Sequence, residues 1–174
     1  MIVPGGKTVA FRSLGCKLNQ FETEFTRENF LRAGYREVNF SQISDIYLIN
    51  TCSVTSKSDY HARQAIRRAR RLSPSSFIIA TGCYAQLNPS ALAGIADLVL
   101  GNREKFDVLH YLKEANGGGR VFTTPSSRFS AFQRMEIKGF HGHTRAFIKV
   151  QDGCSTPCSF CIVPKARGRS RSAP

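Results

Sequence analysis

Short apolar runs separated by amphipathic stretches occupy the first two thirds of the chain. The runs are rich in β-branched and aromatic residues, which favour strands, and they lie at residues 7–13, 45–50, 77–81 and 97–100. Residues 35–40 have a weaker version of this pattern, which predicts an additional strand at the edge of a sheet.

The stretches between the runs have apolar residues three or four positions apart, as on one face of a helix. Helices are therefore predicted over residues 19–33, 56–72, 89–93 and 103–115, with Asn102 as the residue that caps the last one. Strands that alternate with helices predict an α/β fold, in which a mostly parallel sheet carries helices on both faces.

This alternation then stops. Residues 123–143 are rich in Pro, Ser, Gly and basic residues and indicate a linker. Residues 145–150 predict one more strand, which leads into a loop with three cysteines, and the basic tail around Arg167 is expected to be unstructured. We therefore expect an α/β domain at residues 1–122, a linker at 123–143 and the start of a second, truncated domain at 144–174.

The 174-residue chain has 25 Lys and Arg residues against 12 Asp and Glu, which gives a formal net charge of +13. Such an excess favours a polyanionic partner, with nucleic acid as the first candidate; a basic surface that only aids solubility is the alternative. No apolar run approaches the roughly 20 residues that span a bilayer, and the N-terminus lacks a signal-peptide pattern. We therefore expect a cytoplasmic protein without membrane contact, whose six cysteines bind metal or carry redox chemistry.

Three cysteines lie close together near the end of the chain, at Cys154, Cys158 and Cys161. Each iron of a four-iron cluster requires a ligand, so three thiolates leave one iron open for an exchangeable ligand. A zinc knuckle is the alternative, but zinc sites are usually closed by a fourth Cys or His, for which only His141 and His143 are near.

The other three cysteines, Cys16, Cys52 and Cys83, each follow a predicted strand by one to three residues. In a parallel sheet these positions share the carboxyl edge, where ligands of α/β proteins bind, so we expect the three thiols to converge there. Each also lies near the start of a helix, which is expected to lower the pKa of the thiol. The alternative is that cysteine serves only as a small buried residue. The neighbouring Asn19 and Asn50 either donate hydrogen bonds to cluster sulfurs or cap turns.

Four motifs resemble those of radical S-adenosylmethionine (SAM) methylthiotransferases and occur in that family's order. They are GCKLNQ at residues 15–20, NTCSVT at 50–55, GCYAQ at 82–86 and CSTPCSFC at 154–161, the last followed by RGRS at 167–170. The GCKLNQ version is most similar to the branch that acts on N6-threonylcarbamoyladenosine beside the tRNA anticodon. The alternatives are the branch that acts on a ribosomal protein and a non-catalytic RNA-binding module stabilised by zinc or a cluster.

The resemblance implies two 4Fe-4S clusters and SAM as cofactors. It assigns an auxiliary cluster to Cys16, Cys52 and Cys83, and a SAM-binding cluster to Cys154, Cys158 and Cys161 with Phe160 beside it. It also implies that the enzyme adds a methylthio group to carbon 2 of N6-threonylcarbamoyladenosine in tRNA, with an electron donor and a sulfur source as further partners. Because most of the barrel that carries the second cluster is missing, we expect the 174 residues alone to be inactive.

Five arginines lie on the predicted helix at residues 56–72, namely Arg63, Arg67, Arg68, Arg70 and Arg71. We expect them to contact tRNA phosphates, which would give salt-dependent affinity with little sequence preference. A solvated helix face is the alternative interpretation of the same arginines.

Overall fold

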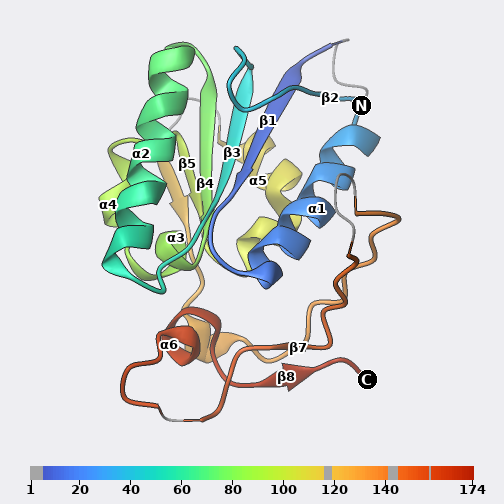
Figure 1. The fold of residues 1–174 in the computed structure, drawn as a ribbon, viewed down its shortest axis with the longest axis vertical. Coiled ribbons are helices and arrows are strands. Elements are labelled where there is room, and N and C mark those ends of the chain that lie inside the picture. Colours follow the sequence, from blue (N-terminus) through green and yellow to red (C-terminus); the bar gives the residue numbers. More distant parts are fainter. Residues whose placement is uncertain (1–5, 116–118, 141–144, 157) are drawn as a thin grey trace.

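A parallel sheet forms the centre of the molecule (Figure 1). The computed structural model describes residues 6–115, 119–140, 145–156 and 158–174. Within these residues, six strands pair in parallel in the order β2-β1-β3-β4-β5-β6. They are β1 (Thr8–Ser13), β2 (Arg36–Glu37), β3 (Ile46–Thr51), β4 (Phe77–Gly82), β5 (Leu98–Leu100) and β6 (Arg120–Phe122).

Helices cover both faces of this sheet, so the predicted α/β fold is confirmed. One face packs against α1 (Lys17–Arg32) and α5 (Val108–Glu114), the latter preceded by the short 3-10 helix η1 (Glu104–Asp107). The other face packs against α2 (Ser56–Leu72), α3 (Cys83–Leu87) and α4 (Ser90–Ala93).

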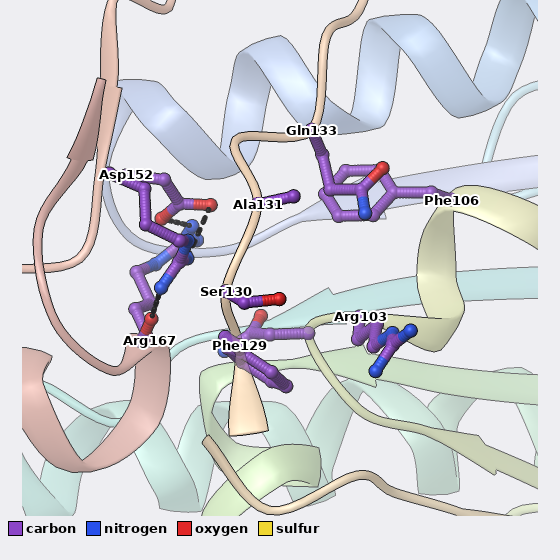
Figure 2. Close-up of a pocket in the computed structure, with 10 residues that line it drawn as sticks. Arg103, Phe106, Phe129, Ser130, Ala131, Gln133, Asp152 and Arg167 are labelled. Atoms are coloured by element: carbon purple, nitrogen blue, oxygen red, sulfur yellow. Dashed lines mark hydrogen bonds and ion pairs between the residues drawn. The ribbon is translucent and has the colours of Figure 1, made fainter. Parts of the chain in front are cut away.

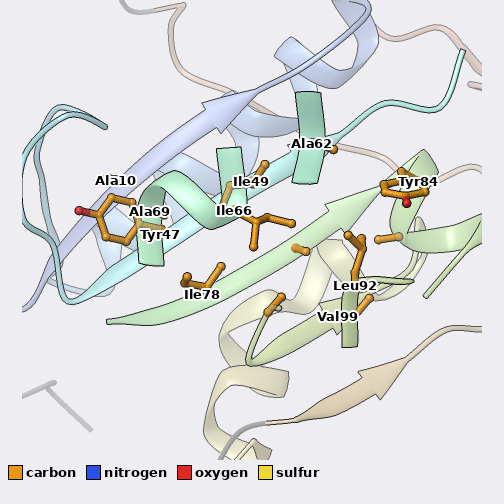
Figure 3. Close-up of a cluster of buried hydrophobic side chains, with 13 residues drawn as sticks. Ala10, Tyr47, Ile49, Ala62, Ile66, Ala69, Ile78, Tyr84, Leu92 and Val99 are labelled. Atoms are coloured by element: carbon orange, nitrogen blue, oxygen red, sulfur yellow. The ribbon is translucent and has the colours of Figure 1, made fainter. Parts of the chain in front are cut away.

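Alternate residues of each strand point to opposite faces of the sheet. Both faces are apolar because helices cover both of them. In β3, Tyr47 and Ile49 pack toward α2, where Ile66 is fully buried between helix and sheet (Figure 3). Ile46 and Leu48 of the same strand pack on the opposite side, in the cluster that includes residues of α1 and α5. This explains why the strands read as continuous apolar runs in the sequence.

The order of the strands reverses between β1 and β3. From β1 the chain moves outward through α1 to β2, and then crosses to β3 on the other side of β1. The connections that leave the carboxyl ends of β1 and β3 therefore diverge, which is the arrangement that leaves a ligand-binding crevice in open α/β sheets.

A C-terminal segment lies beneath the carboxyl ends of these strands (Figure 1). Its elements are the 3-10 helix η2 (Ser126–Arg128), β7 (Gln151–Asp152), α6 (Val163–Arg167) and β8 (Arg171–Ser172). β7 and β8 pair antiparallel. No helix among the described residues is both long and apolar enough to cross a membrane.

Three local predictions are wrong. Residues 145–150 do not form a strand; the pairing starts only at Gln151, opposite Ser172. The tail around Arg167 is not unstructured, because it forms α6 and β8 and its arginine is buried. Asn102 does not cap a helix, because η1 begins two residues later and the Asn102 amide bonds instead to Ala166.

Candidate functional site

The predicted convergence of three cysteines at the carboxyl edge agrees with the fold. Cys16 lies directly before α1, Cys52 directly follows β3, and Cys83 begins α3 directly after β4. Cys16 and Cys52 thus follow the two strands that flank the reversal of strand order. All three cysteines are free.

Two glycines allow the turns to approach each other at this edge. Gly15 has a φ of +91°, and a Cβ there would lie 2.5 Å from the Cβ and Sγ of Cys52. Gly82 has a φ of +97°, and a Cβ there would meet the backbone oxygen of Thr51. Any larger residue at either position would separate the strand ends that carry the cysteines.

Polar side chains connect the same turns. Asn19 Nδ2 donates to the carbonyl oxygens of Leu14 and Thr51, at 2.9 and 3.0 Å. Asn50 Nδ2 donates to the Asn19 carbonyl at 3.0 Å. These contacts agree with the turn-capping interpretation of Asn19 and Asn50, and they fix the turn that carries Cys16 against the end of β3.

Asn102 is a residue of this edge that the sequence interpretation missed. Its Nδ2 lies 3.7 Å from Cys83 Sγ, and it is almost fully buried. The signal was available in the sequence, because a Gly-Asn pair (Gly101-Asn102) comes at the end of β5 as the Gly82-Cys83 pair comes at the end of β4. An amide donor beside a thiolate stabilises its negative charge and tunes any metal group that it holds.

The pKa of Cys52 differs from the expectation. Burial raises the pKa of this thiol, and repulsion from Cys83 and Cys16 raises it further. The lowering expected from the start of a helix is therefore wrong for Cys52, whose helix begins only at Ser56. Metals bind cysteine as the thiolate. Binding of a metal or cluster to Cys52 must therefore release the thiol proton, and higher pH favours it.

The three thiols are also candidate ligands of a single metal ion. Among the described residues, no group of three or more Cys, His, Asp or Glu side chains has the geometry to hold one metal ion. The donor set at this edge is three free thiols at the ends of adjacent strands, with the Asn102 amide beside Cys83. Thiolates of this kind are ligands both of zinc and of iron–sulfur clusters.

The second cysteine set, Cys154, Cys158 and Cys161, lies in the loop between β7 and α6. Hydrogen bonds from the backbone and side chain of Thr156 lower the pKa of Cys154. Phe160 is 92% exposed, so in this structure its ring does not pack on the protein. His141 and His143, the candidates for a zinc knuckle, lie outside the described residues.

A buried ion cluster joins this loop to the α/β domain. Arg167, at the end of α6, makes ion pairs with Glu22 of α1 and with Asp152 of β7. Lys105 and Lys149 also contact the Glu22 carboxylate. Burial alone would raise the pKa of Glu22, but attraction to Arg167 and Lys105 outweighs it and holds this pKa well below its ordinary value.

The arginines of α2 divide into two groups. Arg63 donates to the Tyr84 hydroxyl at 2.5 Å, and Arg70 pairs with Asp97 at 2.6 Å, so both attach α2 to the rest of the fold. The other three, Arg67, Arg68 and Arg71, are exposed, and no ion pair joins them to a carboxylate in the described part of the chain.

A groove of about 510 Å³ connects this helix face to the cysteine edge. Arg68 and Arg71 of α2, Arg12 at the end of β1, and Gly15 beside Cys16 all line it. The ring of Phe40 lies on its wall, with the Arg12 guanidinium 6.0 Å from the ring centroid. A groove with three arginines suits a phosphate backbone.

The fold and the site together define an α/β domain with a cysteine set at its topological switch point and a second cysteine loop packed below it. Residues 8–101 match the family model described as "Uncharacterized protein family UPF0004", and the chain belongs to this family.

The chain is also similar to characterised proteins. It is 41% identical to threonylcarbamoyladenosine tRNA methylthiotransferase MtaB of Aquifex aeolicus, over 94% of this chain and 41% of the relative. The MtaB of Bacillus subtilis is 41% identical over 95% of this chain and 38% of the relative. A tRNA-2-methylthio-N(6)-dimethylallyladenosine synthase of Cereibacter sphaeroides is 31% identical over 94% of this chain and 39% of the relative. The chain thus spans about two fifths of the length of these relatives, and the predicted methylthiotransferase family is confirmed.

Proposed function

We propose that this chain is part of a radical-SAM tRNA methylthiotransferase that modifies carbon 2 of N6-threonylcarbamoyladenosine beside the anticodon. The observation that carries the proposal is the position of both cysteine sets at one end of the sheet. Cys16, Cys52 and Cys83 follow three adjacent strands, and the loop of Cys154, Cys158 and Cys161 is attached below them. The similarity to MtaB proteins supports the choice of nucleoside.

In this proposal each cysteine set holds one 4Fe-4S cluster through three thiolates. Cys16, Cys52 and Cys83 hold the auxiliary cluster, and Cys154, Cys158 and Cys161 hold the cluster that binds SAM. When bound, these groups supply the radical that removes hydrogen and the sulfur that replaces it. Three thiolates per cluster leave one iron free for an exchangeable ligand, which both roles require.

The residues of this chain contribute position and environment. Asn102 donates toward Cys83, and Gly15 permits the close approach of Cys16 and Cys52. Burial of Cys52 excludes water from one side of the auxiliary site, whereas exposed Cys16 leaves the other side open for a sulfur source. An electron donor is the remaining partner that reductive cleavage of SAM requires.

The proposed tRNA contact is the basic groove between α2 and the end of β1. Arg68, Arg71 and Arg12 line it, and it reaches Gly15 beside the auxiliary cysteines. A phosphate backbone bound there would lie next to the reacting groups. Because the proposed substrate is tRNA, the proposed location of the protein is the cytoplasm.

The decisive experiment is expression of the full-length gene in a bacterium that lacks its own enzyme, followed by mass spectrometry of tRNA nucleosides. The proposal predicts the methylthio derivative of N6-threonylcarbamoyladenosine and its loss in a Cys83→Ala variant. A methylthio group on isopentenyladenosine or on a ribosomal protein would contradict the proposed substrate. We expect no SAM cleavage by the 174 residues alone.

A further inference from the structure

Arg167 attaches the end of the second cysteine loop to helix α1. Its side chain is 4% exposed, and its Nη1 and Nη2 donate to Glu22 Oε1 and Oε2 at 2.8 and 2.9 Å. Two parallel hydrogen bonds between guanidinium and carboxylate fix orientation as well as distance. Glu22 lies on the first turns of α1, the helix that begins directly after Cys16.

The same guanidinium closes the base of the loop. Asp152, the last residue of β7 before the loop, accepts from Arg167 Nη1 at 3.0 Å (Figure 2). Gly153 has a φ of +75°, and a Cβ there would meet the backbone oxygen of Arg169. The Cys154 N–H donates to the Gly168 carbonyl at 3.1 Å. Both ends of the loop are therefore held at one point.

Two asparagines extend this contact to the first cysteine set. Arg167 Nη2 donates to Asn19 Oδ1 at 2.9 Å, and the same oxygen lies 3.9 Å from Cys16 Sγ. Asn102 Nδ2 lies 2.8 Å from the Ala166 carbonyl and 3.7 Å from Cys83 Sγ. Each asparagine thus touches one auxiliary cysteine and one residue at the end of α6.

Two lysines also belong to the cluster. Lys105 Nζ donates to Glu22 Oε2 at 2.5 Å and to Asn102 Oδ1 at 2.8 Å. Lys149 Nζ donates to Asp152 Oδ2 at 2.8 Å. All of these charged side chains are at most 8% exposed. A buried ion cluster adds little stability compared with apolar packing, so its fixed geometry suits a role in positioning.

We propose that Glu22 and Arg167 are positioning residues that fix the loop of Cys154, Cys158 and Cys161 relative to Cys16, Cys52 and Cys83. The inference rests on the proposed function, in which each set holds a cluster. Sulfur from one site and the radical from the other must meet at the same substrate atom, so a fixed separation between the sites accelerates the reaction.

Hydrogen–deuterium exchange of the intact chain tests the attachment without any bound cluster. The substitution Arg167→Gln should accelerate exchange of the Cys154 and Ala173 amides, which bond to Gly168 and Val150, by about a hundredfold. Arg167→Lys, which keeps the charge but removes the paired bonds, should give an intermediate increase. Amides of β3 and β4 should accelerate less than the loop amides, because they exchange through unfolding of the whole domain rather than release of the loop.

Arg27→Gln is the matched control. Arg27 lies on the same helix as Glu22 and pairs with Glu24 and Glu37, away from the cysteine loop. This variant should leave the loop amides unchanged. Unaltered loop exchange in Arg167→Gln, or equal acceleration in β3, β4 and the loop, would overturn the proposal.

A second readout tests position. After anaerobic reconstitution and reduction, the electron paramagnetic resonance spectrum should show a magnetic interaction between the two clusters. Arg167→Lys should retain the iron content but change this interaction, which a merely structural residue would not do. If Arg167→Lys has full iron content and an unchanged magnetic interaction, Arg167 does not position the loop and the proposal is overturned. If the unsubstituted chain binds no clusters, the proposed function fails, while the exchange experiment still decides whether the attachment exists.

Discussion

Arg167 and Glu22 are 145 residues apart in the sequence, yet two hydrogen bonds of 2.8 and 2.9 Å join their side chains. This pair brings the end of the second cysteine loop to the helix that follows Cys16. It also explains why the basic tail is ordered, because burial of an arginine requires a partner of opposite charge. The carboxyl edge of the sheet and the C-terminal segment therefore form one site.

The Glu22 carboxyl group should make the free energy of unfolding depend on pH. Attraction to buried cations holds its pKa below the ordinary value of 4.5, despite the opposing effect of burial. A carboxyl group with a lowered pKa contributes stability that is fully present above 4.5 and is lost as the pH falls below that value. Asp152, whose pKa is also lowered, acts in the same direction.

Urea unfolding at a series of pH values measures this effect. Glu22→Gln should lower the free energy of unfolding at pH 7 by about 3–5 kcal/mol, because it leaves buried cations without a partner. Below the ordinary pKa of Glu22, stability of the variant should fall less steeply than that of the unsubstituted chain. Parallel pH profiles of the two proteins would contradict the assignment.

Gly15→Ala should damage the auxiliary site specifically. Both Gly15 and Gly34 have a positive φ, at +91° and +88°, so alanine at either position adds about 1–2 kcal/mol of backbone strain. Only at Gly15 does the new Cβ collide with Cys52; at Gly34 no atom lies within 4 Å. Iron content after reconstitution should fall for Gly15→Ala and stay at the original level for Gly34→Ala. Equal iron content in both variants would argue against a site at Cys52.

The groove arginines should determine how RNA affinity depends on salt. Replacement of Arg68 and Arg71 by Gln should reduce the slope of log affinity against log salt by about one for each phosphate that the variant no longer binds. Filter binding of an anticodon stem-loop measures the slope. Arg70→Gln is the control, because Arg70 is already paired with Asp97; it should leave the slope unchanged. Identical slopes for all three proteins would rule out the groove as the phosphate site.

The sequence predicted those parts of the fold that depend on local pattern. The helix at residues 56–72 was predicted with the observed bounds, because its apolar positions and the following Ser-Pro pair are local signals. The prediction of a strand at residues 145–150 was wrong, because an apolar run of this length forms a strand only where a partner edge is available. Pairing instead begins at Gln151, where β8 lies opposite.

The candidate site could be predicted only in part. Cysteines after successive strands are recognisable, because parallel strands end at a common edge. The contacts of Arg167 and Asn102 join residues that are far apart in sequence, with Arg167 bonding to Asn19 and Asn102 bonding to Ala166. No local pattern indicates such contacts, so the basic tail around Arg167 was expected to be unstructured. Their burial is visible only in the folded chain.

The central claim is that Cys16, Cys52 and Cys83 hold a four-iron cluster. Iron and sulfide analysis of a variant with Cys154, Cys158 and Cys161 all replaced by alanine, after anaerobic reconstitution, tests it most directly. The account predicts about four irons and four sulfides per chain, and loss of both when Cys16, Cys52 and Cys83 are also replaced. Less than one iron per chain in the first variant, or zinc in its place, would contradict the account.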